Sequence, residues 1–268
     1  MSKLTTENSE KYLFAEERQR KIMEVVNTNG KAVVPVLSEM FGVSASTIRN
    51  DLRQLENRNL ITRTHGGAIR NSKAGRELSP TDKESQMMPQ KQAIARAALD
   101  LIDDGDIIAI TTGTTTYELI KLLPVKKGLT VVVNDIRYAV WLEQNTDFNV
   151  YILGGLVRKG YHYTTLPAKN DFLSTINIDK GFFSCNGFDV KKGITAPDYE
   201  TAKNVRQILD SCFETYLMSD SSKLGTVTFA QIADMGYVTS LIVDSDIEKE
   251  EYSALSAVTD VIMTRQEG

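Results

Sequence analysis

The sequence predicts an α/β protein in which a small winged helix-turn-helix domain precedes a larger α/β domain. Two helical patterns around a glycine turn lie within residues 1–70, and a polar stretch with few aliphatic residues follows at 71–89. From about residue 90, short apolar strands alternate with helices, which is typical of a mostly parallel sheet covered on both faces. We expect a helix-turn-helix domain over 14–70, a linker over 71–89 and an α/β domain over 90–264.

The first domain is predicted to contain a helix-turn-helix followed by a two-stranded wing. Gly42 ends the second helix, since glycine tolerates the positive φ of a tight turn. Ser44 is a favourable N-cap for the third helix. The apolar stripe of that helix is Ile48, Leu52 and Leu55, spaced four and three apart. The expected elements are helices over 15–29, 35–41 and 45–57, an extended piece at 32–34 and a glycine-ended hairpin at 60–69.

The third helix has the side chains of an element that reads DNA in the major groove. Arg49 can contact guanine, and Asn50 can contact adenine, through two hydrogen bonds each. Ser46 and Thr47 suit a phosphate or a thymine methyl group, and Arg53 suits a phosphate. The candidate DNA-binding residues are Ser44, Ser46, Thr47, Arg49, Asn50 and Arg53 around the helix, with Arg63 and His65 in the wing.

The charge of the first domain supports a polyanionic partner. Residues 1–70 carry 11 Lys and Arg against 8 Asp and Glu, whereas residues 71–268 carry 20 against 27. A difference this small also arises by chance. Asp51 is expected to pair with an Arg or Lys of the protein itself. Two alternatives stay open: a helical hairpin with solvated arginines, and a domain that binds another protein.

These motifs resemble the DeoR family of bacterial transcription regulators. The resemblance implies a sequence-specific regulator that usually represses transcription, with repression relieved when a ligand binds. The family more often has a second basic residue where this chain has Asn50, a difference that bears on which operator is read. The matching segments are 18–22, Val43-Ser44 with 47–52, and 63–68.

The second domain contains a threonine-rich loop between a predicted strand and helix. Residues 111–116 read Thr-Thr-Gly-Thr-Thr-Thr. Backbone N–H groups at a helix N-terminus can hold a phosphate, although such threonines also serve as simple N-caps. Other polar residues follow predicted strand ends, where ligands bind in parallel sheets. The candidate effector-binding residues are Thr112, Gly113, Thr114, Thr115, Asn134, Gly154, Gly155, Arg158, Asp189, Glu200, Asp220 and Lys223.

This domain resembles the DeoR effector domain, which is similar to the ribose-5-phosphate isomerase and CoA-transferase folds. The resemblance implies a phosphorylated sugar or sugar derivative as the ligand. The alternative is a sugar-phosphate isomerase with an appended DNA-binding domain and Glu200 as its base. However, the Asp-Gly-Ala-Asp loop of the isomerase reads Asn-Gly-Phe-Asp at 186–189, and its Lys-Gly-Gly stretch has no clear counterpart at 191–195. We therefore predict a sensor and not an enzyme.

Several residues near the predicted pocket have two interpretations. Lys223 can pair with a phosphate or be a surface lysine of a loop. The aromatic residues at 161–163 can stack on a sugar or only anchor their loop. Cys185 can be a redox sensor or a buried small hydrophobe. The stretch at 164–168 departs from the small-residue and Gly-Pro pattern of the family, so the pocket wall can differ.

The remaining expectations concern partners and compartment. The sequence has no run of about 18 apolar residues, so no membrane span is expected. Cys185 and Cys212 fit no metal or redox spacing, so no cofactor or metal is expected, and the cytoplasm is the expected compartment. The expected partners are double-stranded operator DNA and a phosphorylated sugar. We also expect a dimer or tetramer joined through the effector domain, because one recognition helix contacts too few bases for useful specificity.

Overall fold

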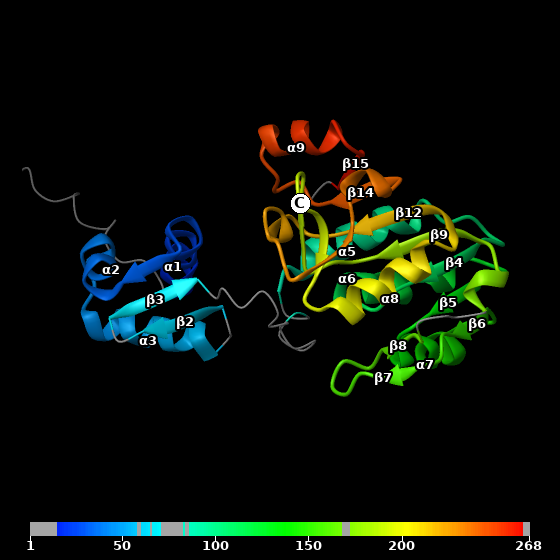
Figure 1. Cartoon of the computed structure of the whole chain (residues 1–268), viewed down its shortest axis with the longest axis horizontal. Coiled ribbons are helices and arrows are strands. Elements are labelled where there is room, and N and C mark those ends of the chain that lie inside the picture. The colour runs from blue at the N-terminus through cyan, green and yellow to red at the C-terminus, as the bar shows by residue number, and fades with distance from the viewer. Residues whose placement is uncertain are drawn as a thin grey trace, which may run out of the picture. The chain divides into compact units, whose positions relative to one another are not determined.

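The computed structural model describes residues 15–57, 60–64, 66–70, 83, 86–167 and 172–264. The chain divides into two units, Met1–Ala74 and Gly75–Gly268, whose elements are shown in Figure 1. Most of the predicted linker and the wing residue His65 lie outside the described residues. Among the described helices, none combines the length and the apolar character that a membrane crossing needs.

The first unit is a winged helix-turn-helix, as the sequence predicts. Gly42 takes the left-handed conformation with φ 63°, and the Ser44 Oγ accepts the Thr47 N–H at 3.2 Å. The predicted stripe of the third helix, Ile48, Leu52 and Leu55, is buried in the core. The elements are α1 (Ala15–Asn29), β1 (Lys31–Val33), α2 (Val34–Phe41), α3 (Ala45–Asn57), β2 (Ile61–Thr64) and β3 (Gly67–Arg70).

The wing has one strand more than predicted. The extended piece before α2 is β1, which pairs antiparallel with β3 to give the order β1-β3-β2. A Cβ on Gly67 would lie 2.0 Å from the Ala32 carbonyl oxygen. Glycine is therefore required where β1 and β3 meet.

The second unit is built on a seven-stranded parallel sheet with the order β15-β14-β12-β9-β4-β5-β6. The predicted parallel α/β architecture is thus confirmed. The apolar runs at 130–133 and 240–243 predict strands, and β5 and β14 have these bounds. The strands are β4 (Ile107–Ile110), β5 (Thr130–Val133), β6 (Asn149–Ile152), β9 (Ile178–Phe183), β12 (Cys212–Met218), β14 (Ser240–Val243) and β15 (Asp260–Met263).

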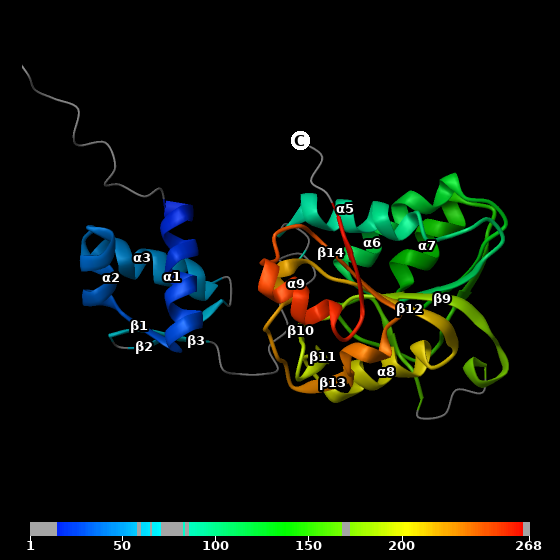
Figure 2. The same ribbon diagram turned by 90° about the horizontal axis from the view of Figure 1, so that it is seen from above.

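Helices cover both faces of the sheet. Successive side chains of each strand point to opposite faces, so each strand contributes to the core on both sides. Ile108 and Ile110 pack in a core with α5, α6 and α7, while Ala109 packs on the opposite side with residues of α8. Figure 2 shows these helices on the two sides of the sheet. The helices are α5 (Met88–Leu99), α6 (Thr114–Leu122), α7 (Ile136–Asn145), α8 (Tyr199–Leu209) and α9 (Lys249–Ser256), with 3-10 turns at Leu123–Val125, Leu173–Thr175, Ser221–Lys223 and Met235–Tyr237.

Two small β-structures, together with α9 and β15, are absent from the sequence prediction. Their strands are only two to four residues long, which is too short for alternation to stand out. One is a hairpin of β7 (Leu156–Val157) and β8 (Thr164–Thr165). The other is an antiparallel sheet of β10 (Gly187–Asp189), β11 (Gly193–Ala196) and β13 (Ala230–Ala233), which packs with α8.

Candidate functional site

The recognition helix α3 presents a polar face opposite its buried stripe. Ser46, Arg49, Asn50 and Arg53 are all exposed on it. The Arg53 Nη2 donates to the Asn50 Oδ1 at 2.6 Å. This bond uses one of the two lone pairs of that oxygen and fixes the direction of the Asn50 amide in this arrangement.

At the start of α3, the Ser44 hydroxyl lies 2.7 Å from the Ser46 hydroxyl and 2.9 Å from that of Thr47. These hydroxyls cluster where the helix N-terminus leaves backbone N–H groups without helical partners. In the wing, exposed Arg63 pairs with Glu56 at 3.4 Å. This pair lies between exposed side chains and contributes little stability, so Arg63 can be released to a phosphate.

Asp51 is buried and holds α3 against α1, which confirms its predicted role within the protein. The Arg18 guanidinium donates to both carboxylate oxygens, at 2.6 Å to Oδ2 and 3.1 Å to Oδ1. The Gln19 amide donates to the same carboxylate at 3.4 Å. A bidentate ion pair of this kind fixes the relative orientation of the two side chains as well as their distance. It fixes the orientation of α3 relative to α1.

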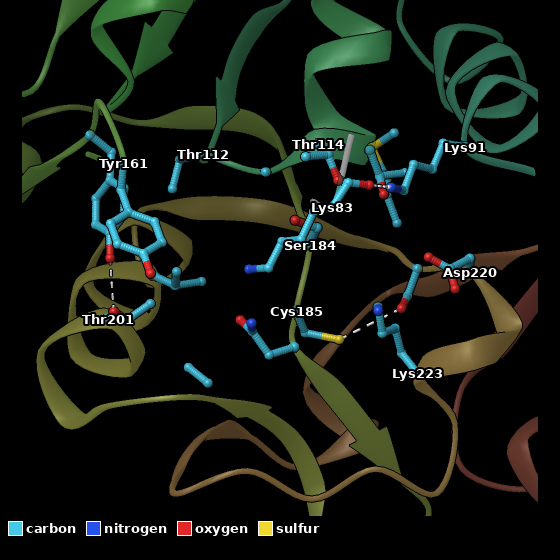
Figure 3. A pocket seen from close by; sticks show the side chains of 18 of the residues that line it. Lys83, Lys91, Thr112, Thr114, Tyr161, Ser184, Cys185, Thr201, Asp220 and Lys223 are labelled. Carbon is cyan, nitrogen blue, oxygen red and sulfur yellow. Dashed lines mark hydrogen bonds between the residues drawn. The ribbon is translucent and has the colours of Figure 1, made fainter. Parts of the chain in front are cut away.

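The second unit contains a polar pocket at the carboxyl end of its sheet (Figure 3). The loops that follow β4, β9 and β12 meet there, as expected for parallel strands. Helices α5, α7 and α8, strands β11 and β13 and the β7–β8 hairpin complete the walls. The residues that carry its polar chemistry are Lys83, Lys91, Thr112, Gly113, Thr114, Thr115, Arg137, Tyr161, Tyr163, Ser184, Asn186, Thr201, Ser219, Asp220 and Lys223.

The threonine-rich loop is held by groups behind it. The Asn134 Oδ1 accepts the Thr112 N–H at 2.9 Å, and the Tyr138 hydroxyl accepts the Gly113 N–H at 2.9 Å. Asn134 therefore positions the loop and does not line the pocket. A Cβ on Gly113 would lie 2.0 Å from the Ser184 Oγ, so only glycine permits this close approach.

Positive charge dominates the pocket. Among the described lining residues, four are cationic, Lys83, Lys91, Arg137 and Lys223, and one is a carboxylate, Asp220. Lys91 is 3% exposed. Burial lowers the pKa of Lys91 to about 8, Asp220 opposes this effect, and Lys223 and Lys83 add to it. The lining thus holds more cationic than anionic side chains, although Arg137 already pairs with Asp135 at 3.3 Å.

The β7–β8 hairpin supplies an aromatic wall. The Tyr163 hydroxyl lies 2.9 Å from the Thr201 Oγ1 at the start of α8. Arg158 donates to the same Thr201 oxygen and pairs with Asp198, both at 3.1 Å. Its guanidinium also lies over the Tyr161 ring, 4.3 Å from the centroid. Arg158 thus fastens the hairpin to α8 without itself lining the pocket.

The structure separates the predicted effector residues into two groups. Thr112, Gly113, Thr114, Thr115, Asp220 and Lys223 line the pocket, whereas Asn134, Gly154, Gly155, Arg158, Asp189 and Glu200 do not. Glu200 is exposed on α8. The Asp189 carboxylate accepts the backbone N–H groups of Lys191 and Lys192, at 2.8 and 2.9 Å. It closes a turn and does not line the pocket.

The sequence prediction missed lining residues from remote segments, mainly Lys91, Arg137, Ser184 and Asn186. Cys185 also lines the pocket, where burial raises the pKa of its thiol to about 12. A thiol of that pKa is not a reactive thiolate, which favours the interpretation as a buried small side chain. No group of three metal-ligating side chains occurs within the described part of the chain.

A winged helix-turn-helix joined to an α/β unit with a polar pocket defines a DNA-binding regulator with a ligand-sensing domain. Residues 18–74 match the DeoR-like helix-turn-helix domain, and residues 86–245 match the DeoR C terminal sensor domain. The chain belongs to the DeoR family of transcription regulators.

Named relatives agree with this assignment. HTH-type transcriptional regulator GlpR of Haloferax volcanii is 34% identical, over 91% of this chain and 97% of its own length. A lactose phosphotransferase system repressor of Staphylococcus epidermidis is 33% identical, over 88% of this chain and 94% of its own length. These relatives confirm the prediction of a regulator in preference to an isomerase.

Similarity to solved structures is weak. A ribose 5-phosphate isomerase from Plasmodium falciparum matches with a TM-score of 0.38 and 14% identity, over 51% of this chain and 52% of that chain. A likeness at this level carries no information about the ligand.

Proposed function

We propose that the second unit of this regulator binds a phosphorylated sugar or sugar derivative in the pocket at Thr112–Thr115, and that this ligand controls binding of the first unit to operator DNA. The observation that carries the proposal is the excess of cations over carboxylates around the backbone N–H groups of the first turn of α6. Such N–H groups and the helix dipole favour an anion. The neighbouring hydroxyl and aromatic side chains suit a sugar.

The ligand proposal is tested by a thermal-shift screen of the full chain against phosphorylated sugars, sugar alcohols and their unphosphorylated forms. A phosphorylated compound should raise the melting temperature, and its unphosphorylated form should not. Thr114→Asp places a carboxylate beside the anion and should abolish the shift. Thr175→Asp, at an exposed threonine that does not line the pocket, is the matched control. A normal shift with Thr114→Asp would move the ligand elsewhere.

The DNA proposal assigns base contacts to Arg49 and Asn50 and a phosphate contact to Arg53. Ser46 and Thr47 contact a phosphate or a thymine methyl group, and Arg63 and His65 of the wing contact the DNA backbone or the minor groove. Arg49→Ala should reduce discrimination between operator and random duplex DNA by about 1–3 kcal/mol if its contact is two-pronged. Band-shift titrations on both DNAs measure this difference. Arg20→Ala, at an exposed arginine of α1, should keep the ratio. An equal loss on both DNAs with Arg49→Ala would contradict base reading.

The regulator is proposed to act as a homo-oligomer in the cytoplasm, the compartment that contains its operator DNA. Two recognition helices read two half-sites, and a dimer or tetramer supplies them. The ligand binds one arrangement of the subunits more tightly than another and shifts the population of arrangements. The ligand is expected to relieve repression and so to raise transcription. Transcription measured from the regulator's own operator, with and without the active compound, decides the direction of this effect.

A further inference from the structure

Part of the pocket wall comes from the chain that precedes α5. Lys83, Gln86 and Met87 line the pocket, and Lys83 lies between residues 18–74 and 86–245, the two regions that match the domains of the family. Figure 3 shows the Lys83 side chain extending into the pocket. We call Lys83 and residues 86–91, which lead into α5, the entry segment. This segment follows the stretch of chain that comes from the helix-turn-helix.

The backbone of the entry segment is tied to the pocket through Lys91. The Lys91 ammonium donates a hydrogen bond to the Lys83 carbonyl oxygen, drawn as a dashed line in Figure 3. The same oxygen accepts the Gln86 N–H at 3.3 Å. Because an ammonium group has three N–H donors, Lys91 can hold this carbonyl and also donate to a ligand. Lys91 thus connects the entry segment to the interior of the pocket.

The backbone is strained where the entry segment turns into α5. Met87, directly before the helix, has the left-handed angles φ 53° and ψ 35°, and its side chain makes no cap hydrogen bond. A residue other than glycine keeps this conformation only where the surrounding structure holds it. Two contacts do so here: Lys91 holds the Lys83 carbonyl, and the Gln90 Nε2 donates to the Asp246 Oδ2 at 3.3 Å. The conformation of the segment therefore depends on groups at the pocket.

Three lysine side chains repel one another at this end of the pocket. Burial lowers the pKa of Lys91, Asp220 raises it, and the charges of Lys223 and Lys83 lower it further. One carboxylate thus faces three ammonium groups among these four lining side chains. An anion between the lysines offsets the repulsion and accepts charge-assisted hydrogen bonds from them.

We infer that Lys83 binds the phosphate of the ligand together with Lys91, so that the ligand fastens the entry segment to the sensor domain. This inference rests on the proposed function, because it requires an anion in this pocket. A ligand that contacts Lys83 binds more tightly when the segment has the conformation described above, and it raises the population of that conformation. The ligand thereby acts on the part of the chain that leads to the helix-turn-helix.

Inorganic phosphate is the probe for the first test, because it has the group that the lysines recognise. Thermal-shift titrations of the full-length chain with sodium phosphate, against sodium chloride of equal ionic strength, measure its dissociation constant. Lys83→Met should weaken phosphate binding about tenfold, as expected when a hydrogen bond between charged groups is lost. Lys83→Arg keeps the charge and should restore most of the affinity. Lys127→Met, at an exposed lysine that does not line the pocket, should bind phosphate as the parent does.

Hydrogen exchange of the full-length chain tests whether the anion fastens the entry segment. In the parent, saturating phosphate should slow the exchange of the backbone amides between Gln86 and Lys91 several-fold, because opening the segment then breaks the contact of Lys83 with the anion. In Lys83→Met, at a phosphate concentration that again saturates the thermal shift, the same amides should be slowed much less. A purely structural effect of the substitution would instead change their exchange equally with and without phosphate.

A folded Lys83→Met variant that binds phosphate as the parent does would overturn the inference, as would parent amides whose exchange phosphate does not change. If this variant does not fold, the exchange measurement on the unaltered chain decides. A parent that does not bind phosphate refutes the anion site of the proposed function and the inference with it. Only the inference is refuted if phosphate binding is lost in Thr114→Asp and kept in Lys83→Met.

Discussion

Binding of the phosphorylated ligand should draw a proton onto the protein at alkaline pH, through Lys91. Burial lowers the pKa of this lysine to about 8. At that pKa the neutral fraction is about 0.1 at pH 7 and about 0.8 at pH 8.5. A phosphate beside the side chain favours its charged form, so binding should take up about 0.1 proton at pH 7 and about 0.8 at pH 8.5.

Isothermal titration calorimetry in two buffers of different ionisation enthalpy measures this uptake. At pH 8.5 a phosphate monoester, whose second pKa is about 6, is already dianionic, so the proton must bind to the protein. The affinity of the parent should fall as the pH rises above 8. Lys91→Met should bind weakly and without proton uptake. Heats at pH 8.5 that do not depend on the buffer would refute the assignment of Lys91 to the anion.

Two further predictions concern single contacts. Asp51→Ala leaves Arg18 buried without its carboxylate, and should lower the free energy of unfolding of the helix-turn-helix by about 3–5 kcal/mol in urea titrations; a loss well under that range would show the pair to be weak. Gly113→Ala forces the loop away from Ser184 and should abolish the ligand-induced thermal shift. Gly154→Ala, where a Cβ meets nothing within 4 Å, should leave the shift intact. Equal loss of the shift in both variants would contradict the conclusion that Gly113 lines the pocket and Gly154 does not.

Local rules were sufficient to predict the helix-turn-helix of the first unit, although not the pairing of β1 with β3. A glycine turn, a serine N-cap and an apolar stripe each act within a few residues, and the structure contains all three. The internal role of Asp51 was also predictable, since a carboxylate is unsuited to a phosphate backbone. Its partner, Arg18, was not, because that pairing depends on how α1 packs against α3.

The pocket was predictable only where one segment carried the signal. The loop at Thr112–Thr115 joins a strand to a helix, so its place at the sheet edge follows from the sequence pattern. Lys91 lies on α5 among ordinary helix formers, and only the packing of α5 beside the loops brings it to the pocket. Asp189 and Glu200 show the converse, since a polar residue near a strand end can close a turn or face solvent.

The hydrogen bond between Arg53 and Asn50 has a consequence for how this regulator searches DNA. While Arg53 holds the Asn50 carbonyl, it fixes the direction of the amide group with which we propose Asn50 contacts adenine. A backbone phosphate that draws Arg53 away leaves this amide free to turn. We therefore expect base reading by Asn50 to be coupled to the phosphate contact proposed for Arg53.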